Sequence, residues 1–293
     1  MSDPDRPAAA PALRVTGLLE RYGLRPKRTL GQNFLADVGL CEKIARTVSP
    51  TGTGSVLEIG AGTGALTAPL LALGCHVTAV ETDRALCQVL RDTFARPIEA
   101  GQLSLIEADV QEIDLDAVFG ALPGPRTLAG NLPYNLSGLL LRRTVELVPP
   151  PERSVFLLQL EVVDRMVAAP GTESYGALSV FVQAVTAPTR AFVVKRGAFY
   201  PQPNVDSAVV VLTPLAQPYL VDEVFSSVVR AAFEKRRKTL RNAWRNVLGV
   251  GLAELEARAA EAGISLDLRG EVLGVADFAR MASGLRQQRR EGR

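Results

Sequence analysis

Along the first two-thirds of the chain, short apolar runs alternate with segments in which apolar residues recur at helical spacing. No other feature limits the possible folds as strongly. The apolar runs predict buried strands at residues 55–60, 76–81, 103–108, 127–131 and 155–160. The helical spacing predicts helices at residues 15–22, 38–48, 64–73 and in a stretch that ends near residue 93. This alternation predicts a mostly parallel sheet with right-handed crossovers, a doubly wound, Rossmann-like α/β fold.

The last third of the chain has a different pattern. Residues 192–195 and 207–213 predict two strands joined by the proline-rich residues 199–204, and this pair could add an antiparallel edge hairpin to the sheet. Beyond Pro214 and Pro218 only helical patterns remain, at residues 221–233, 237–248, 252–262 and 275–285. We therefore expect a disordered lead-in over residues 1–12, an α/β domain over residues 13–215 and a smaller all-helical domain over residues 216–293.

Composition argues against several classes of protein. No apolar run approaches the roughly 18–20 residues that span a bilayer, and the first residues lack the pattern of a signal peptide. Cys41, Cys75 and Cys87 are odd in number and have no C-x-x-C spacing, which predicts reduced thiols in a cytoplasmic protein. The single histidine, His76, is expected to be structural or solvated. Histidine-based catalysis and a metal site are therefore not expected.

Positive charge is concentrated near the C-terminus. Residues 1–229 carry 19 Lys and Arg against 23 Asp and Glu, whereas residues 230–293 carry 14 against 8. A basic segment on a nearly neutral body is typical of an enzyme that acts on a polyanion. A solvated basic helix gives the same pattern, so charge alone does not decide between the two.

Polar residues at successive predicted strand ends indicate a nucleoside site. Residues 58–64, EIGAGTG, lie at a strand-to-helix turn, and their G-x-G-x-G spacing differs from the G-x-G-x-x-G of diphosphate binders. Glu81 ends the next strand and can accept both hydroxyls of a ribose. Asp109 follows the third strand and can accept from an adenine amino group. Ligands of such folds bind at the carboxyl ends of parallel strands, where these residues are expected.

The residues after the fourth strand, Asn131-Leu132-Pro133-Tyr134, can hold an exocyclic amine. The amide oxygen of Asn131 and a backbone carbonyl near Pro133 can accept both protons of an NH2 group. Tyr134 can stack on the face of the base. A proline-containing turn with a structural asparagine is the alternative, and the adjacent nucleoside site makes it the weaker one.

Taken together, these motifs resemble those of the ribosomal RNA adenine N6-methyltransferases, within them the small-subunit (16S) rRNA adenine dimethyltransferases. The glycine loop is shared with most methyltransferases, whereas GQNFL, NLPY and F-x-P-x-P-x-V-D-S together are far more specific. The matching segments are TLGQNFL at residues 29–35, EIGAGTGALT at 58–67, NLPYNLS at 131–137, QLEVVDRM at 159–166, YGALSV at 175–180, FYPQPNVDS at 199–207 and RRKTLRN at 236–242.

The resemblance implies an S-adenosylmethionine-dependent enzyme and assigns roles to residues. Phe199 would face Tyr134 across a flipped adenine, with Asn131 and Pro133 completing the catalytic set. The implied cofactor-binding residues are Asn33, Leu35, Gly60, Gly62, Glu81, Asp109 and Asn131. Asn204 and Leu160 stand where lysine is expected, which puts only a peripheral RNA contact in doubt.

Two groups of cations are expected to bind RNA, and the larger group makes the helical domain the expected RNA-binding domain. They are Arg25, Lys27 and Arg28, and the run Lys235, Arg236, Arg237, Lys238, Arg241 and Arg245. The implied target is two adjacent adenosines in a hairpin loop near the 3′ end of small-subunit rRNA, within a partly assembled subunit. A monomer is expected, with no membrane partner, because no apolar helix stripe is left unpaired.

Three alternatives remain open at this stage. One is the related antibiotic-resistance type, which methylates a large-subunit rRNA adenine and shares the site chemistry. Another is a non-catalytic RNA-binding or transcription factor on the same scaffold, which the combined cofactor and amine motifs disfavour. The third is a dinucleotide dehydrogenase, which the glycine spacing and the missing histidine or lysine acid disfavour.

Overall fold

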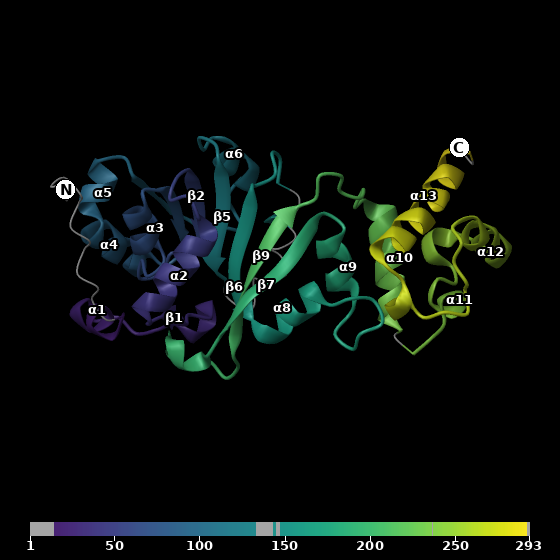
Figure 1. Cartoon of the computed structure of the whole chain (residues 1–293), viewed down its shortest axis with the longest axis horizontal. Coiled ribbons are helices and arrows are strands. Elements are labelled where there is room, and N and C mark those ends of the chain that lie inside the picture. Colours follow the sequence, from purple (N-terminus) through teal and green to yellow (C-terminus); the bar gives the residue numbers. More distant parts are fainter. Residues whose placement is uncertain (1–14, 133–142, 145–146, 236, 292–293) are drawn as a thin grey trace. The chain divides into compact units, whose positions relative to one another are not determined.

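The computed structural model describes residues 15–132, 143–144, 147–235 and 237–291. The chain forms two compact units (Figure 1). Unit 1 comprises Met1–Val163 and Thr189–Thr213, and unit 2 comprises Asp164–Pro188 and Pro214–Arg293. One boundary lies near the expected division at residue 215, and residues 164–188 pack with unit 2. The expected roles of the two parts stay predictions.

A seven-stranded sheet forms the centre of unit 1, with the strand order β4-β3-β2-β5-β6-β9-β7. The strands are β2 (Ser55–Ile59), β3 (His76–Glu81), β4 (Leu103–Glu107), β5 (Arg126–Asn131), β6 (Arg153–Gln159), β7 (Thr186–Val194) and β9 (Ser207–Pro214). The pairs from β4 to β6 are all parallel, and β9 runs antiparallel to β6. The predicted fold, a mostly parallel sheet with an antiparallel edge, is therefore confirmed.

Helices follow the strands of unit 1. They are α1 (Val15–Arg21), α2 (Val38–Val48), α3 (Thr67–Leu73), α4 (Arg84–Thr93), α5 (Ala95–Glu99) and α6 (Leu115–Gly120), with α8 (Leu160–Val167) running from unit 1 into unit 2. The core packs strand residues such as Val56 and Ala79 against Ile44 of α2 and Leu70 of α3. Among the described residues, no helix is both long and apolar enough to cross a membrane.

The helix after the glycine loop begins later than the sequence predicts, at Thr67 rather than residue 64. Gly64 has a φ of +81°, which lies outside the helical region and favours glycine. A Cβ at this position would also lie 2.3 Å from Cε2 of Phe94. Residues 64–66 are therefore not helical, because the chain at Gly64 packs tightly against Leu90 of α4 and against Phe94, the C-cap residue of α4.

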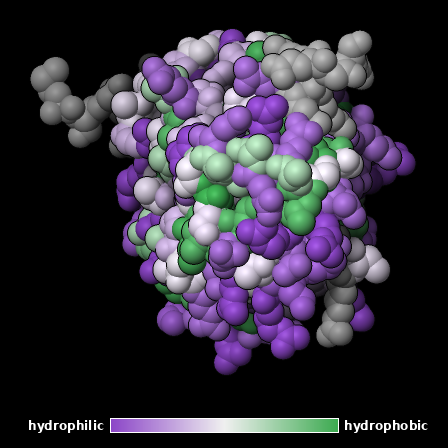
Figure 2. Space-filling view, turned by 90° about the vertical axis from the view of Figure 1, so that its right-hand side faces the viewer, coloured by the Kyte–Doolittle hydropathy of each residue, from purple (hydrophilic) through white to green (hydrophobic). Residues whose placement is uncertain are grey.

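Unit 2 is helical apart from the first residues of β7. Its helices are α9 (Ala177–Gln183), α10 (Glu223–Glu234), α11 (Leu240–Ala243), α12 (Leu252–Glu261) and α13 (Val275–Glu291). Trp244 is fully buried, and its indole nitrogen donates to the carbonyl of Val228 at 2.8 Å. Asp222 caps α10 and binds Arg286 of α13 through both carboxylate oxygens. The face of unit 2 in Figure 2 is mostly hydrophilic, with a small apolar area near its centre.

The predicted helix over residues 237–248 is wrong. Helix α10 ends at Glu234, Lys235 and Lys238 lie in the turn that follows, and α11 is only four residues long. The backbone N–H groups of Leu240 and Arg241 donate to carbonyls of residues 268 and 266, at 2.7 and 2.9 Å. These tertiary bonds fix the start of α11. The basic run therefore lies largely in a turn instead of on one helix.

A buried carboxyl joins β2 to α3 beneath the glycine loop. Glu58 is 2% exposed, and Thr67 Oγ1 donates to its Oε2 at 2.6 Å. Burial raises the pKa of Glu58 from 4.5 to about 8; the hydrogen bond from Thr67 lowers it, and nearby Glu81 raises it. The folded protein therefore holds a proton on Glu58 at neutral pH.

This raised pKa makes stability depend on pH. The unfolded chain releases the Glu58 proton above about pH 5 and the folded chain only near pH 8, so stability falls as pH rises between these values. Glu58→Gln cannot release a proton and still accepts from Thr67. We expect its free energy of unfolding, relative to wild type, to rise by roughly 3–4 kcal/mol from pH 5 to pH 8.

Urea denaturation at both pH values measures this change, and Glu99→Gln, at an exposed site, is the control. A difference between Glu58→Gln and wild type that stays constant across the pH range would contradict a buried, protonated Glu58.

Candidate active site

A cleft in unit 1 lies at the carboxyl ends of β2, β3, β4 and β5. One wall is the segment from Thr29 to Phe34, and the others are the glycine loop and the residues that follow the strands. Six of the seven predicted cofactor-binding residues line this cleft: Asn33, Gly60, Gly62, Glu81, Asp109 and Asn131. The seventh, Leu35, is buried outside the cleft lining. The structure thus brings together residues that lie up to 98 positions apart in the sequence.

The glycine loop adopts a conformation that favours glycine. Gly60 has a φ of +74° and Gly62 a φ of +59°. The N–H of Gly60 donates to the carbonyl of Val80 at 2.8 Å, which ties the loop to β3. A Cβ on Gly62 would lie 3.2 Å from the ring of Phe34. The loop therefore packs closely against the wall formed by residues 29–34.

Glu81 is held by two backbone amides at the end of β3. The N–H of Gly62 donates to its Oε2 at 2.7 Å, and the N–H of Asp83 donates to its Oε1 at 2.9 Å. Burial raises the pKa of Glu81, while these two hydrogen bonds oppose the rise. Each oxygen keeps a second lone-pair site, so the carboxylate can also accept the two hydroxyls of a ribose.

Asp109 lies two residues beyond β4, and its Oδ1 accepts from the N–H of Gln111 at 2.8 Å. Arg143 holds the same loop: Nη1 donates to the carbonyl of Val110 at 2.5 Å and Nη2 to that of Ile113 at 2.7 Å. No sequence motif identifies Arg143, because the carbonyls that it binds lie 33 and 30 positions away in the sequence.

Asn131 ends β5 with a defined amide orientation. Its Nδ2 donates to the backbone carbonyl of Asn33 at 2.9 Å. Because the nitrogen end is engaged in this way, the oxygen end is the one that can accept a proton from an incoming amine. This orientation matches the role predicted for Asn131. Pro133 and Tyr134 lie outside the described residues.

Phe199 lies beside the wall of the cleft. Strand β8 (Phe199–Tyr200) pairs antiparallel with β1 (Phe34–Leu35), so Phe199 is opposite Leu35. The N–H of Ala36 also donates to the carbonyl of Ala198 at 2.8 Å. Phe199 is only 5% exposed and packs in the core of unit 1. The β1–β8 pairing thus connects the predicted aromatic residue to the segment that carries Asn33.

Several predicted RNA-binding cations have acidic partners. Lys27 binds Asp83 at 2.8 Å, and Arg241 of unit 2 binds Glu256 and Asp267. The other described side chains of the set are exposed and, within the described part of the chain, have no acidic partner: Arg25, Lys235, Arg237, Lys238 and Arg245. Arg236 and the side chain of Arg28 lie outside the description.

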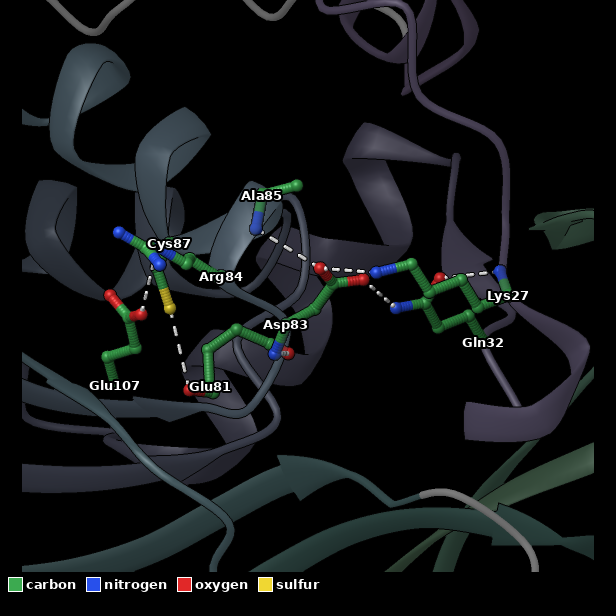
Figure 3. A network of polar contacts seen from close by, with 8 residues as sticks. All are labelled: Lys27, Gln32, Glu81, Asp83, Arg84, Ala85, Cys87 and Glu107. Carbon is green, nitrogen blue, oxygen red and sulfur yellow. Dashed lines mark hydrogen bonds and ion pairs between the residues drawn. The ribbon is translucent and has the colours of Figure 1, made fainter.

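The partner of Lys27 is the centre of a network that the sequence analysis missed (Figure 3). Asp83 Oδ1 accepts from Lys27 Nζ at 2.8 Å, and its Oδ2 accepts from Gln32 Nε2 at 3.0 Å. The backbone N–H of Lys27 in turn donates to Oε1 of Gln32 at 2.8 Å. Burial raises the pKa of Asp83, but hydrogen bonds from Lys27, Gln32 and Ala85 and the charge of Lys27 together lower it below its usual value. The network joins the start of the 29–34 wall to the turn after β3.

Among the described residues that line this cleft there is no cysteine. Cys41, Cys75 and Cys87 are buried and free, and burial raises the pKa of each thiol. Among the described residues, no group of three or more His, Cys, Asp or Glu side chains is placed to hold a metal ion. The lining of the cleft combines apolar side chains such as Leu30 and Leu86 with glycines and hydrogen-bond acceptors, which suits a nucleoside-containing ligand.

Two solved structures share the fold of this chain. A dimethyladenosine transferase from Plasmodium falciparum has a TM-score of 0.71 and 25% identity, covering 88% of this chain and 98% of that one. The 23S rRNA methyltransferase ErmE has a TM-score of 0.64, covering 87% and 100%, and at 23% identity it shows the fold alone.

Comparison of the amino-acid sequence with those of known proteins identifies the family more specifically than the fold does. A relative from Xanthomonas campestris pv. campestris (strain B100) is 45% identical over 260 residues, which cover 88% of this chain and 95% of the relative. One from Anaeromyxobacter sp. (strain K) is 42% identical over 272 residues, which cover 89% and 94%. Both are named ribosomal RNA small subunit methyltransferase A. A model for the family described as ribosomal RNA adenine dimethylase matches residues 23–286. The chain therefore belongs to the ribosomal RNA adenine dimethylase family.

Proposed function

We propose that the protein transfers methyl groups from S-adenosylmethionine to the N6 nitrogen of two adjacent adenosines in a hairpin loop near the 3′ end of small-subunit 16S rRNA. The substrate is met in a ribosomal assembly intermediate. Membership of the dimethylase family and the name of the curated relatives support this reaction. The observation that carries it is the amide of Asn131, which the bond to Asn33 orients at the edge of the cleft.

The residues of the cleft fit the methyl donor. Gly60 and Gly62 leave room for the amino-acid and ribose portions to lie along the backbone. Glu81 offers acceptors for the ribose hydroxyls, and Asp109 offers an acceptor for the adenine amine. When bound, S-adenosylmethionine supplies an already activated methyl group. The protein therefore has to supply alignment, desolvation and electrostatic stabilisation, and it needs no general base before attack.

Asn131 and the segment around Pro133 would perform the alignment. Accepting both amine protons directs the nitrogen lone pair toward the methyl group and opposes conjugation with the ring. As the nitrogen gains positive charge, the pre-oriented amide oxygen of Asn131 stabilises it. The leftover proton leaves to water. The target base has to be unstacked first, at a cost of a few kcal/mol that is smallest in a loop.

Two further expectations follow from the proposed substrate. A protein that modifies ribosomal subunits during assembly in bacteria works in the cytoplasm, and the three free cysteines suit that compartment. We also expect the protein to act as a monomer, which size-exclusion chromatography with light scattering can measure.

Large-subunit methylation of the resistance type remains the second candidate, because its site chemistry is the same.

Removing the charge of Glu81 should weaken binding of the methyl donor. In Glu81→Gln, the new NH2 group would face the N–H of Gly62 or of Asp83, so donor would oppose donor. We expect the Kd for S-adenosylmethionine, measured by isothermal titration calorimetry, to rise roughly 10- to 100-fold. Glu107→Gln, which changes a carboxylate at the adjacent strand end but outside the cleft lining, is the control. Equal affinity in wild type and Glu81→Gln would contradict the proposed ribose contact.

Asn131→Ala should lose methyl transfer even when S-adenosylmethionine is saturating. Without the amide oxygen the amine is neither held nor stabilised, and we expect the rate to fall roughly 10²- to 10³-fold. The assay follows labelled methyl groups into ribosomal subunits that lack the modification, with product nucleosides identified by mass.

The products in wild type separate the candidates. Dimethyladenosine in small-subunit rRNA supports the proposal, and methylated adenine in large-subunit rRNA would assign the protein to the resistance type. No transfer to either RNA, with the donor bound, would favour a non-catalytic RNA-binding factor.

The basic turn of unit 2 should contribute to RNA affinity. Changing Lys235, Arg237 and Lys238 to Gln removes three exposed cations, so binding to the subunit should weaken. The slope of log affinity against log salt concentration should also become less steep, by the equivalent of about two to three phosphate contacts. Arg241→Gln should change affinity less, because Glu256 and Asp267 already neutralise this residue. An unchanged salt dependence in the triple variant would exclude the turn from the RNA interface.

A further inference from the structure

The wall of the cleft formed by residues 29–34 has little regular structure to hold it. Residues 28–30 form a single 3₁₀ turn, and regular pairing begins only at Phe34 in β1. Backbone bonds within this stretch are few and long: the N–H groups of Leu30 and Gln32 donate to the carbonyl of Lys27 at 3.2 and 3.4 Å. The position of the wall therefore depends on side-chain contacts to the rest of unit 1.

Asp83 supplies these contacts at the N-terminal end of the wall. Its Oδ1 accepts from Lys27 Nζ and its Oδ2 from Gln32 Nε2, at 2.8 and 3.0 Å (Figure 3). The Asp83 side chain is only 5% exposed, so water competes weakly for these bonds. At the C-terminal end, the carbonyl of Asn33 accepts from Asn131. The wall is thus attached at both ends by polar side chains.

The same residue also contacts the carboxylate at the end of β3. The backbone N–H of Asp83 donates to Oε1 of Glu81 at 2.9 Å. Oδ1 of Asp83 caps α4 by accepting from the N–H of Ala85 at 3.1 Å. Asp83 therefore connects the carboxylate proposed to bind the ribose with the 29–34 wall of the same cleft.

We propose that Asp83 is a positioning residue, which holds residues 29–34 in place as the wall of the methyl-donor cleft through its bonds to Lys27, just before the wall, and to Gln32 within it. This inference rests on the proposed function of the cleft. Lys27 then acts on donor binding and not, as the sequence predicted, on RNA. When the link is broken, only a fraction of molecules have the wall in place, and the apparent affinity for the donor falls by that fraction.

Asp83→Asn isolates the link because it keeps the helix cap. Asparagine caps helices about as well as aspartate, so its oxygen can still accept from Ala85. Its NH2 group faces Nε2 of Gln32, and the charge that pairs with Lys27 is lost. The matched control is Asp114→Asn, since Asp114 caps α6 in the same way by accepting from the N–H of Ala117 and does not line the cleft.

We expect the two kinetic constants, KM and kcat, to respond differently to these substitutions. For Asp83→Asn and for Lys27→Met, we expect KM for S-adenosylmethionine to rise about tenfold, which corresponds to about 1.4 kcal/mol. We expect kcat at saturating donor to stay within about twofold of wild type, because donor binding restores the wall. Asp114→Asn should leave both constants unchanged. The double variant Lys27→Met/Asp83→Asn should be no worse than either single variant, because both break the same link.

Hydrogen exchange gives an independent measurement. In both single variants, the amides of residues 29–34 should exchange faster, while those of α4 stay protected because the cap remains. If Asp83→Asn does not fold, the KM and hydrogen-exchange measurements on Lys27→Met test the proposal, since this variant leaves Asp83 and the helix cap in place.

Four outcomes would overturn the proposal. They are an unchanged KM in Lys27→Met, a fall in kcat alone, additive effects in the double variant, and weaker rRNA binding by Lys27→Met with unchanged donor affinity. If the wild-type protein does not bind S-adenosylmethionine, that result would instead contradict the proposed function itself.

Discussion

The parallel pairing of β3, β2, β5 and β6 is the constraint on which the rest of unit 1 depends. Because parallel strands all end at one edge, Glu81 after β3 and Asn131 after β5 reach the same cleft. Close pairing needs small residues at some points: a Cβ on Gly130 of β5 would lie 2.5 Å from the carbonyl of Ile59. The sheet therefore places the polar residues, and hydrogen bonds with the backbone then fix their orientation.

Most of the fold could be predicted because its signals are local. Residues 76–81 were predicted as a strand and form β3 with the same bounds, since β-branched residues between turn signals indicate a buried strand. The helix predicted over residues 237–248 failed for the opposite reason. Leu240 and Arg241 bond to a loop more than 20 residues away, and Asn246 and Leu248 adopt φ values of 63° and 56°. Helical spacing of apolar residues does not reveal such tertiary bonds.

The candidate site likewise has a part that could be predicted from the sequence and a part that could not. Strand ends and glycine turns can be read from the sequence, and Glu81, Asp109 and Asn131 do line one cleft. Asp83 and Arg143 were missed because their partners lie 56 and 33 positions away and form no periodic pattern. Their bonds support the loops that carry the predicted residues, so the cleft depends on residues that no motif identifies.

The most direct test of this account is a crystal structure with S-adenosylhomocysteine, the demethylated donor. We expect the ribose hydroxyls within hydrogen-bond distance of the Glu81 carboxylate and the adenine amine beside Asp109. The sulfur should lie near the amide oxygen of Asn131, with Nδ2 still donating to Asn33. S-adenosylhomocysteine bound outside the cleft, or an Asn131 amide turned with its nitrogen toward the sulfur, would contradict the account.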